Sequence, residues 1–460
     1  MHYNVIKSYF PPCGKGLPCA KKKVKTIVLF GAGKSASVLI DYILNESEKN
    51  DWQLIVADSN KDIIESKTHG HKRSKSIVTD ITDTHKRREL IATADIVISM
   101  MPASLHFLIA EDCISLSKHL LTASYVDDKI KSLDKKAKEA GILFLCEMGL
   151  DPGIDHMSAM KIFDEINADG GKIFSFKSHC GGLVAPESDD NPWHYKISWN
   201  PRNVILAGKA GATYLLNNKT INEPYENLFA NNNELDINGQ SFGYYPNRDS
   251  LSYIQTYNLK NLETFIRTTL RMPEFMQGWD KIIKLKLTDE QTKFATEGLS
   301  FAKFYSNHFE THGLQENFKM LCDELFLSQI NYLGYNDDSS FLNIGEATAA
   351  DVMQFIVEKK LMLQPTDKDL VVMVHEVEFE KDNKKNLLKS ILYLKGNNSI
   401  YTAMAKTVGL PLGIAANLIL NGKINLTGVH IPVKKEIYIP VLQELEKFDV
   451  RFEEQLQQIS

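Results

Sequence analysis

Residues 146–199 carry the side chains with the most distinctive chemistry in this chain. A carboxylate, Asp151, lies in an Asp-Pro-Gly turn sequence, a second carboxylate and an imidazole follow at Asp155 and His156, and a thiol precedes two glycines at Cys180. Such groups exchange protons with substrates. Polar loops between apolar elements commonly hold catalytic residues, so this stretch predicts the reacting part of an active site.

Several of these residues also have a purely structural interpretation. A carboxylate at Asp155 can cap the helix expected to begin at His156, and we favour that role for it. His156 is more often a core or capping histidine than a general base. A buried, inert thiol is almost as good an interpretation of Cys180 as a catalytic one. The residues alone leave these alternatives open.

The preceding part of the chain has the pattern of a dinucleotide-binding domain. Residues 25–30 form an apolar run of strand length, and GAGKSA follows directly before a helical pattern. A buried strand, a tight glycine turn and a helix N-terminus together bind a pyrophosphate. Gly31 allows the turn, Gly33 lets the backbone approach phosphate, and Ala36 takes the third small position. The cofactor contacts predicted at this turn are Gly31, Ala32, Gly33, Lys34 and Ser35.

Asp58 ends the next apolar run, residues 54–57, at about the distance where an acidic residue binds the adenosine ribose. A carboxylate there accepts hydrogen bonds from both ribose hydroxyls and repels a 2′-phosphate. We therefore expect NAD in preference to NADP. The alternative is that Asp58 caps the helix expected near Lys61.

Further apolar runs alternate with helical patterns, which indicates a doubly wound parallel sheet. Residues 96–99, 120–123 and 142–146 are three of the expected strands. The loops that follow such strands face the cofactor. The residues placed there are Met101, Pro102 and Ala103 after one strand, and Ser124, Tyr125 and Val126 after the next. A tyrosine at that position could also simply cover the edge of the sheet.

Three long motifs connect the chain to a known family. They are GLDPGIDH at residues 149–156, HCGGLVAPE at residues 179–187, followed by a Trp-containing segment, and TAMAKTVGLPLGIAANLILNGKI at residues 402–424. Together they resemble the glutamate-forming saccharopine dehydrogenases, over about residues 25–433. The resemblance implies oxidation of saccharopine by NAD(P)+ and water to glutamate and 2-aminoadipate 6-semialdehyde, or the reverse reaction, in lysine metabolism.

The resemblance also implies which residues contact the substrate. Cys180 matches a family residue near the reacting carbon, and both Arg248 and Arg271 match substrate contacts. Unpaired arginines are usually exposed, but saccharopine carries several carboxylates far apart, and guanidinium groups bind carboxylates bidentately. The substrate-binding residues implied are Ser124, Tyr125, Asp151, Arg248, Thr269, Leu270 and Arg271.

The implied reaction needs a proton acceptor for the substrate amine and for the attacking water. The expected catalytic residues are Asp151 and Tyr125 together with Cys180. An unperturbed aspartate is too acidic and an unperturbed tyrosine too basic for this role. Burial or neighbouring charge would have to tune one of them.

Two departures from the family pattern bear on the cofactor. Fungal relatives that use NADP tend to carry a basic residue where this chain has Asp58, and many relatives have an aromatic residue where it has Ala103. The alternatives to the implied function are a related reductive condensation of the carboxynorspermidine or homospermidine type, and a cofactor-binding sensor without catalysis. Paired arginines suit a dicarboxylate better than a polyamine.

Composition narrows the class of protein. A net charge of −5 argues against a nucleic-acid partner, and the apolar run at 408–420 is interrupted by Pro411 and Gly413 and is too short to span a bilayer. Six scattered cysteines, and the lack of an apolar signal-peptide core in the first twenty residues, favour reduced thiols in the cytoplasm. Cys13 and Cys19 lack a second pair with zinc-site spacing, so no metal is expected.

The predicted fold class is α/β, with a Rossmann-type doubly wound parallel sheet, a second α/β domain with a mixed sheet, and a small helical insertion. A chain of 460 residues is too long for one compact core. The second sheet offers a surface for a homodimer. The expected segments are an extension at 1–23, a dinucleotide-binding domain at 24–128 joined by 397–460, a substrate domain at 129–272 and 336–396, and the insertion at 273–335.

Overall fold

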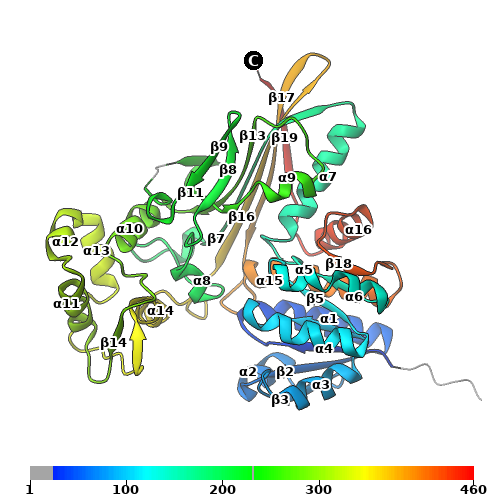
Figure 1. The fold of residues 1–460 in the computed structure, drawn as a ribbon, viewed down its shortest axis with the longest axis horizontal. Helices are drawn as coiled ribbons and strands as arrows, with labels where there is room; N and C mark the ends of the chain where they lie inside the picture. The colour runs from blue at the N-terminus through cyan, green and yellow to red at the C-terminus, as the bar shows by residue number, and fades with distance from the viewer. Residues whose placement is uncertain (1–23, 231–232, 460) are drawn as a thin grey trace, which may run out of the picture.

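The computed structural model describes residues 24–230 and 233–459. The extension predicted at residues 1–23 lies outside them. Two large sheets organise the chain: the first, with its helices, forms one end of the molecule in Figure 1 (blue to cyan), and a helical unit (yellow-green) forms the other. The second sheet lies between them.

The first sheet has seven parallel strands in the order β18-β6-β5-β4-β1-β2-β3. Its central strand, β1, is buried on both faces from Ile27 to Phe30, which is typical of parallel sheets covered by helices. The predicted doubly wound sheet is confirmed. The elements are β1 (Thr26–Phe30), η1 (Lys34–Ala36), α1 (Ser37–Asn50), β2 (Gln53–Asp58), α2 (Lys61–Thr68), β3 (Ser74–Val78), α3 (Thr84–Thr93), β4 (Ile96–Ser99), η2 (Ala103–Leu105), α4 (His106–Leu116), β5 (His119–Thr122), α5 (Asp128–Ser132), α6 (Asp134–Glu139) and β6 (Leu143–Leu145).

The second sheet is mixed and has ten strands, as the predicted substrate domain required. Its main path runs β10-β11-β13-β7-β16-β17-β19, in which β13 and β7 are parallel and the other neighbours antiparallel. The elements are α7 (Ile154–Ala168), β7 (Lys172–Val184), η3 (Pro186–Ser188), α8 (Pro201–Ile205), β8 (Ala212–Leu216), β9 (Lys219–Glu223), η4 (Tyr225–Asn227), β10 (Glu234–Ile237), β11 (Gln240–Pro246), β12 (Arg248–Asp249), α9 (Ser252–Thr256), β13 (Thr264–Arg271), β16 (Asp369–Lys381), β17 (Lys384–Lys395) and β19 (Glu453–Ile459).

The helical unit is larger than the insertion predicted at 273–335. Its core continues into α14, where Val352, Met353 and Ile356 are buried with Trp279 and Phe304. Helix α14 packs with this unit because its apolar face is covered by that core. The elements are α10 (Pro273–Lys284), β14 (Lys293–Ala295), α11 (Phe301–His312), α12 (Gln315–Leu321), α13 (Glu324–Tyr332), β15 (Glu346–Thr348) and α14 (Ala349–Lys360).

The C-terminal segment belongs to both sheets. Helices α15 (Ala403–Leu420) and α16 (Lys435–Glu446) cover the first domain, and β18 (Gly428–His430) pairs with β6. The last strand, β19, instead pairs with β17 of the second sheet. The first domain also extends through β6, past the boundary predicted at residue 128, because β6 pairs with both β5 and β18.

Helix α15 packs directly behind the glycine turn. It is the one helix of the described residues long and apolar enough to cross a membrane, but 83% of it is buried inside the protein. A Cβ atom on Gly409 would lie 3.0 Å from the backbone nitrogen of Leu39 and 3.2 Å from the carbonyl oxygen of Ser35. The small residue therefore sets how closely α15 approaches α1 and the turn before it.

We predict that Gly409→Val destabilises the protein by about 1–3 kcal/mol, because the added methyl groups must push α15 away from α1. Helix propensity alone predicts the opposite sign, since glycine is a poorer helix former than valine. Chemical denaturation measures the free energy of unfolding. The matched control is Lys406→Val on the partly exposed side of α15, and equal stability of the two variants would contradict close packing at Gly409.

Candidate active site

A glycine turn places the two carboxylates predicted from the sequence. Gly153 has φ 147°, and a Cβ atom there would lie 2.1 Å from the carbonyl oxygen of Gly149, so only glycine fits. Helix α7 begins immediately afterwards at Ile154. Asp155 lies in its first turn, where one of its oxygens accepts from the Gly153 N–H at 2.6 Å. Asp155 is therefore not the N-cap residue that was expected, because the helix begins before it, but its carboxylate still satisfies the backbone N–H of the N-cap residue Gly153.

The Asp151 carboxylate joins the two domains. The Tyr125 hydroxyl, from the loop after β5, donates to Asp151 Oδ1 at 2.9 Å. The same oxygen accepts from Nη2 of Arg267 on β13, and that nitrogen also donates to Asp155 Oδ2 at 2.7 Å. The Asp151 side chain keeps 12% of its surface exposed, whereas Asp155 and Arg267 keep 2% each. Of these charged groups, Asp151 is the one that remains accessible.

Burial and charge tune these groups in different directions. Burial raises the pKa of Asp151, against the opposing charge of Arg267, and the charge of Asp155 raises it further. Burial also acts to raise the pKa of Asp155, but the charges of His156 and Arg267 outweigh it and lower that pKa. Burial raises the pKa of Tyr125 far above its ordinary value, so its hydroxyl stays protonated. Asp151 is therefore the better proton acceptor of the two carboxylates, because its pKa is raised and its side chain remains partly exposed.

Cys180 lies in the same site. It is on β7, opposite Thr269 of β13, and its thiol feels the charges of Asp151 and Arg271. Burial raises its pKa well above the ordinary value, so the thiol stays protonated and is not a nucleophile at neutral pH.

The end of β13 carries an unpaired cation. Arg271 is 2% exposed, and its guanidinium carbon lies 5.3 Å from the ring centre of Tyr195 and 5.6 Å from that of Phe275. Within the described residues it has no carboxylate in ion-pair distance, and its Nε has no hydrogen-bond partner. The side chain of Leu270 points to the opposite face, where it packs in the core against Gly181. A buried guanidinium without an anion is suited to bind an acidic ligand.

Arg248 also reaches the site. It has φ 52°, a conformation that is uncommon for residues other than glycine. Its guanidinium carbon lies 5.2 Å from the ring centre of Tyr125. Of the two substrate-binding arginines implied by the sequence, the exposed Arg248 therefore lies against Tyr125, and the buried Arg271 is near enough to Cys180 for its charge to act on that thiol.

The glycine turn has the form of a phosphate-binding site. Gly31 has φ 95°, and a Cβ atom there would lie 3.0 Å from the backbone of Met100. At Gly33 nothing lies within 4 Å of an added Cβ atom, so the backbone is open to a ligand. Helix η1, which contains Lys34 and Ser35, follows at once.

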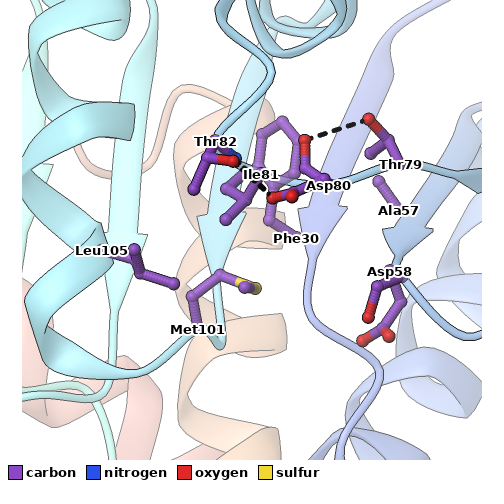
Figure 2. Close-up of a pocket in the computed structure, with 10 residues that line it drawn as sticks. Phe30, Ala57, Asp58, Thr79, Asp80, Ile81, Thr82, Met101 and Leu105 are labelled. Carbon is purple, nitrogen blue, oxygen red and sulfur yellow. Dashed lines mark hydrogen bonds between the residues drawn. The ribbon is translucent and has the colours of Figure 1, made fainter.

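A cavity of about 240 Å³ lies beside this turn. Figure 2 shows Met101 and Leu105 on one side of it and Ala57, Asp58 and Thr79 on the other. This is the end of the sheet where a doubly wound domain binds the adenosine part of a dinucleotide. Pro102 and Ala103 lie at the start of η2, next to Met101.

The Asp58 carboxylate already has hydrogen-bond partners within the first domain. Its carboxylate accepts hydrogen bonds from the backbone N–H groups of Ala32 at 2.8 Å and Asn60 at 3.0 Å. The Lys67 ammonium donates to the Gly33 carbonyl. Burial lowers the pKa of Lys67 to about 8, with the charge of Asp58 acting in the opposite direction. A cation therefore lies next to Asp58, and the helix cap of α2 is Asn60 and not Asp58.

Three residues that support the site were not predicted from the sequence. His106 contacts Ser99 Oγ through Nδ1 and Ser124 Oγ through Nε2, both at 2.8 Å, and burial lowers its pKa to about 4. Glu147 accepts from the N–H of Val126 at 3.0 Å. The third is Arg267.

Of these three residues, only Arg267 could have been identified from a pattern in the sequence. Side chains two apart on a strand share a face, so the spacing of Arg267, Thr269 and Arg271 could have placed Arg267 in the site. No local pattern identifies Glu147 and His106, because their partners come from other elements of the folded chain. His156, expected as a core or capping histidine, is buried and hydrogen-bonded to Tyr257 and Glu147.

Comparison with known proteins identifies the family. Residues 27–145 match the family model described as Saccharopine dehydrogenase NADP binding domain, and residues 149–450 match Saccharopine dehydrogenase C-terminal domain. The chain is 32% identical over 451 residues to the Saccharopine dehydrogenase [NADP(+), L-glutamate-forming] of Pyricularia oryzae, covering 94% of this chain and 99% of that one. It is also 32% identical to the Alpha-aminoadipic semialdehyde synthase of Arabidopsis thaliana, covering 94% of this chain but only 45% of the relative. The chain thus spans about half the length of such synthases.

These comparisons correct the predicted cofactor. The preference for NAD drawn from Asp58 was wrong, because the matching domain model and the fungal relatives are described as NADP-binding or NADP(+)-linked. The structure gives a physical reason. The Asp58 carboxylate is bound to Ala32 and Asn60, and Lys67 places a positive charge beside it, so its charge alone does not decide the preference.

A solved structure agrees with the sequence comparisons. The apo saccharopine dehydrogenase (L-Glu forming) from Saccharomyces cerevisiae superposes with a TM-score of 0.83 at 30% identity, covering 94% of this chain and 100% of that one. The resemblance predicted from the sequence motifs is confirmed, and this chain belongs to the saccharopine dehydrogenase family.

Proposed function

We propose that this protein is an NADP-dependent saccharopine dehydrogenase of the L-glutamate-forming type. It would oxidise L-saccharopine with NADP+ and water to L-glutamate and L-2-aminoadipate 6-semialdehyde, or catalyse the reverse reaction. The observation that carries this proposal is the buried, unpaired guanidinium of Arg271, whose charge acts on Cys180, the same thiol on which the charge of Asp151 acts. The matching fungal relatives support it by name.

The arginines suit a substrate with several carboxylates. A carboxylate bound to Arg271 would satisfy a charge that finds no anion within the described part of the protein. Arg248 is exposed and would bind a second carboxylate at the mouth of the site. Guanidinium groups bind carboxylates bidentately and so orient them. Two such contacts would hold the secondary amine of saccharopine in one pose.

The residues at the glycine turn fit a dinucleotide, because Gly33 is open, the neighbouring cavity is lined by Asp58, and the Lys67 ammonium lies at the Gly33 carbonyl. Bound NADP+ would supply the hydride acceptor. Asp151 would accept the proton from the substrate amine and later from water. Tyr125 would donate its hydrogen bond to Asp151 throughout, because its hydroxyl stays protonated.

We further propose that the protein is a homodimer located in the cytoplasm. Support for the dimer comes from β19, an outer strand of the second sheet with Leu456 exposed, because an outer strand presents unpaired backbone groups to a partner. Support for the compartment comes from the cysteines described, all of which are free thiols, at Cys113, Cys146, Cys180 and Cys322.

Absorbance at 340 nm tests the proposed reaction directly. We expect NADPH to form when the protein is given saccharopine and NADP+, and to be consumed with glutamate and the semialdehyde. Binding of NADPH without turnover would identify a cofactor-binding protein without this catalysis. Turnover of carboxynorspermidine in place of saccharopine would identify a polyamine enzyme.

Replacing Arg271 tests carboxylate recognition. We expect Arg271→Met to raise KM for saccharopine about 10- to 100-fold, since a hydrogen-bonded ionic contact contributes roughly 1.5–3 kcal/mol, while the Kd for NADPH stays unchanged. The matched control is Arg202→Met, whose arginine is paired with Glu290 and Asp351 elsewhere. An unchanged KM in the Arg271 variant would exclude this residue from substrate binding.

Replacing Asp151 tests the proton acceptor. An ionised Asp151 is required for oxidation, so kcat/KM should fall as the pH drops through its raised pKa. Asp151→Asn should lower kcat/KM about 10²- to 10⁴-fold and remove this acidic limb of the profile. If the variant turns over saccharopine as fast as the unmodified protein at every pH, Asp151 is not the proton acceptor.

A further inference from the structure

One nitrogen atom of Arg267 connects three groups of the site. Nη2 donates to Asp151 Oδ1, to Asp155 Oδ2 at 2.7 Å and, more weakly, to the Tyr125 hydroxyl at 3.3 Å. The guanidinium carbon lies 4.6 Å from the ring centre of Tyr253, which packs against it. The cation is therefore held in place by contacts on several sides.

The two carboxylates depend on this cation. Asp151 lies just before α7 and Asp155 in the first turn of that helix, and an oxygen of each contacts the same nitrogen. Two buried carboxylates this close cannot both stay ionised without a positive charge between them. Other titratable groups interact with one of the two carboxylates: His156 on α7, Cys180 on β7, Tyr253 on α9, Tyr257 after α9, and His375 on β16. Three more charged groups contact or act on the neighbours of the pair: Glu147 contacts His156 and Tyr253, Arg248 lies over Tyr125, and the charge of Arg271 acts on Cys180.

The geometry also leaves one oxygen of Asp151 available. Oδ1 is occupied by Tyr125 and Arg267. Oδ2 has no hydrogen-bond partner within residues 24–230 and 233–459, and the side chain is partly exposed. A carboxylate held at one oxygen cannot rotate freely about its last bond, so the other oxygen keeps a fixed direction.

We propose that Arg267 and Asp155 are positioning residues of this active site: Arg267 holds Oδ1 of Asp151 so that Oδ2 faces the substrate amine, and Asp155 anchors the guanidinium. This proposal rests on the proposed function, because it assigns to Asp151 the role of proton acceptor. Neither positioning residue exchanges a proton with the substrate. Both act on the reaction only through Asp151.

A purely structural ion pair is the competing interpretation. Breaking a buried ion pair costs stability in either case, so a loss of stability does not distinguish the two. Arg267→Lys does, because lysine keeps the charge but not the planar contacts. A pair that acts only through its charge would leave kcat of this variant unchanged, whereas the loss of positioning lowers kcat. Removing the cation and removing the anion act in opposite directions on the charge of Asp151, so these two variants test whether Asp151 is coupled to both residues.

The experiment compares the acidic limb of kcat/KM for saccharopine oxidation in several variants. We expect Arg267→Met to shift this limb to higher pH by about one pH unit or more, and Asp155→Asn to shift it to lower pH. In the double variant, the pH of the limb should be nearer to that of the unmodified protein than it is in Arg267→Met. Arg267→Lys keeps the charge but not the planar contacts, so it should retain the position of the limb while kcat falls about tenfold or more.

Controls separate folding and function from positioning. Thermal denaturation and NADPH titration identify variants that are folded and bind cofactor, and Arg202→Met should leave the limb in place. If Arg267→Met does not fold, the shift of the limb in Asp155→Asn and the fall of kcat in Arg267→Lys still test the proposal. A limb that stays at the same pH in Arg267→Met and Asp155→Asn, or moves in the same direction in both, would overturn the proposal.

The failure of the proposed function has a different signature. If Asp151→Asn retains the acidic limb, or saccharopine is not turned over at all, Asp151 is not the proton acceptor of that reaction. If Asp151→Asn abolishes the limb while the Arg267 and Asp155 variants do not move it, the function stands and the positioning role is excluded.

Discussion

The burial of like charges is the constraint on which the site depends. Asp151 and Asp155 lie at the start of α7, where the chain leaves the first domain, and both are largely removed from water. Only a buried cation allows them to remain together, and β13 of the second domain supplies it as Arg267. The contact that stabilises the carboxylates therefore also docks the substrate domain against the loop that carries Tyr125.

Local patterns allowed much of the fold to be predicted, because the residues involved contact their neighbours in the chain. The glycine turn at Gly31 and Gly33, the alternation of strands and helices in the first domain, and the turn at Gly153 are of this kind. The boundaries were less accurate. The pairing of β19 with β17 and the cover that α14 gives to the helical unit depend on contacts far apart in sequence, which no local pattern specifies.

The predicted site also divides into features that the sequence motifs identified and features that depend on partners elsewhere in the fold. Tyr125, Asp151, Cys180 and Arg271 lie together as the motifs implied. The NAD preference drawn from Asp58 was wrong because Asp58 has a cation beside it. That cation is Lys67, which comes from the last turn of α2. A residue type and its spacing state what a side chain can do, but its partners decide which of those roles it takes.

Arg267 and Arg271 show how partners decide roles on a single strand. They are four residues apart on β13, and both are buried. Arg267 lies between two carboxylates, so its charge is already balanced and a ligand has little to add. Arg271 lies between two aromatic rings. Aromatic rings stabilise a cation much less than a buried carboxylate does, so the missing charge must come from outside the described fold. This difference in partners supports the two proposed roles, in which Arg267 positions Asp151 and Arg271 binds an acidic substrate.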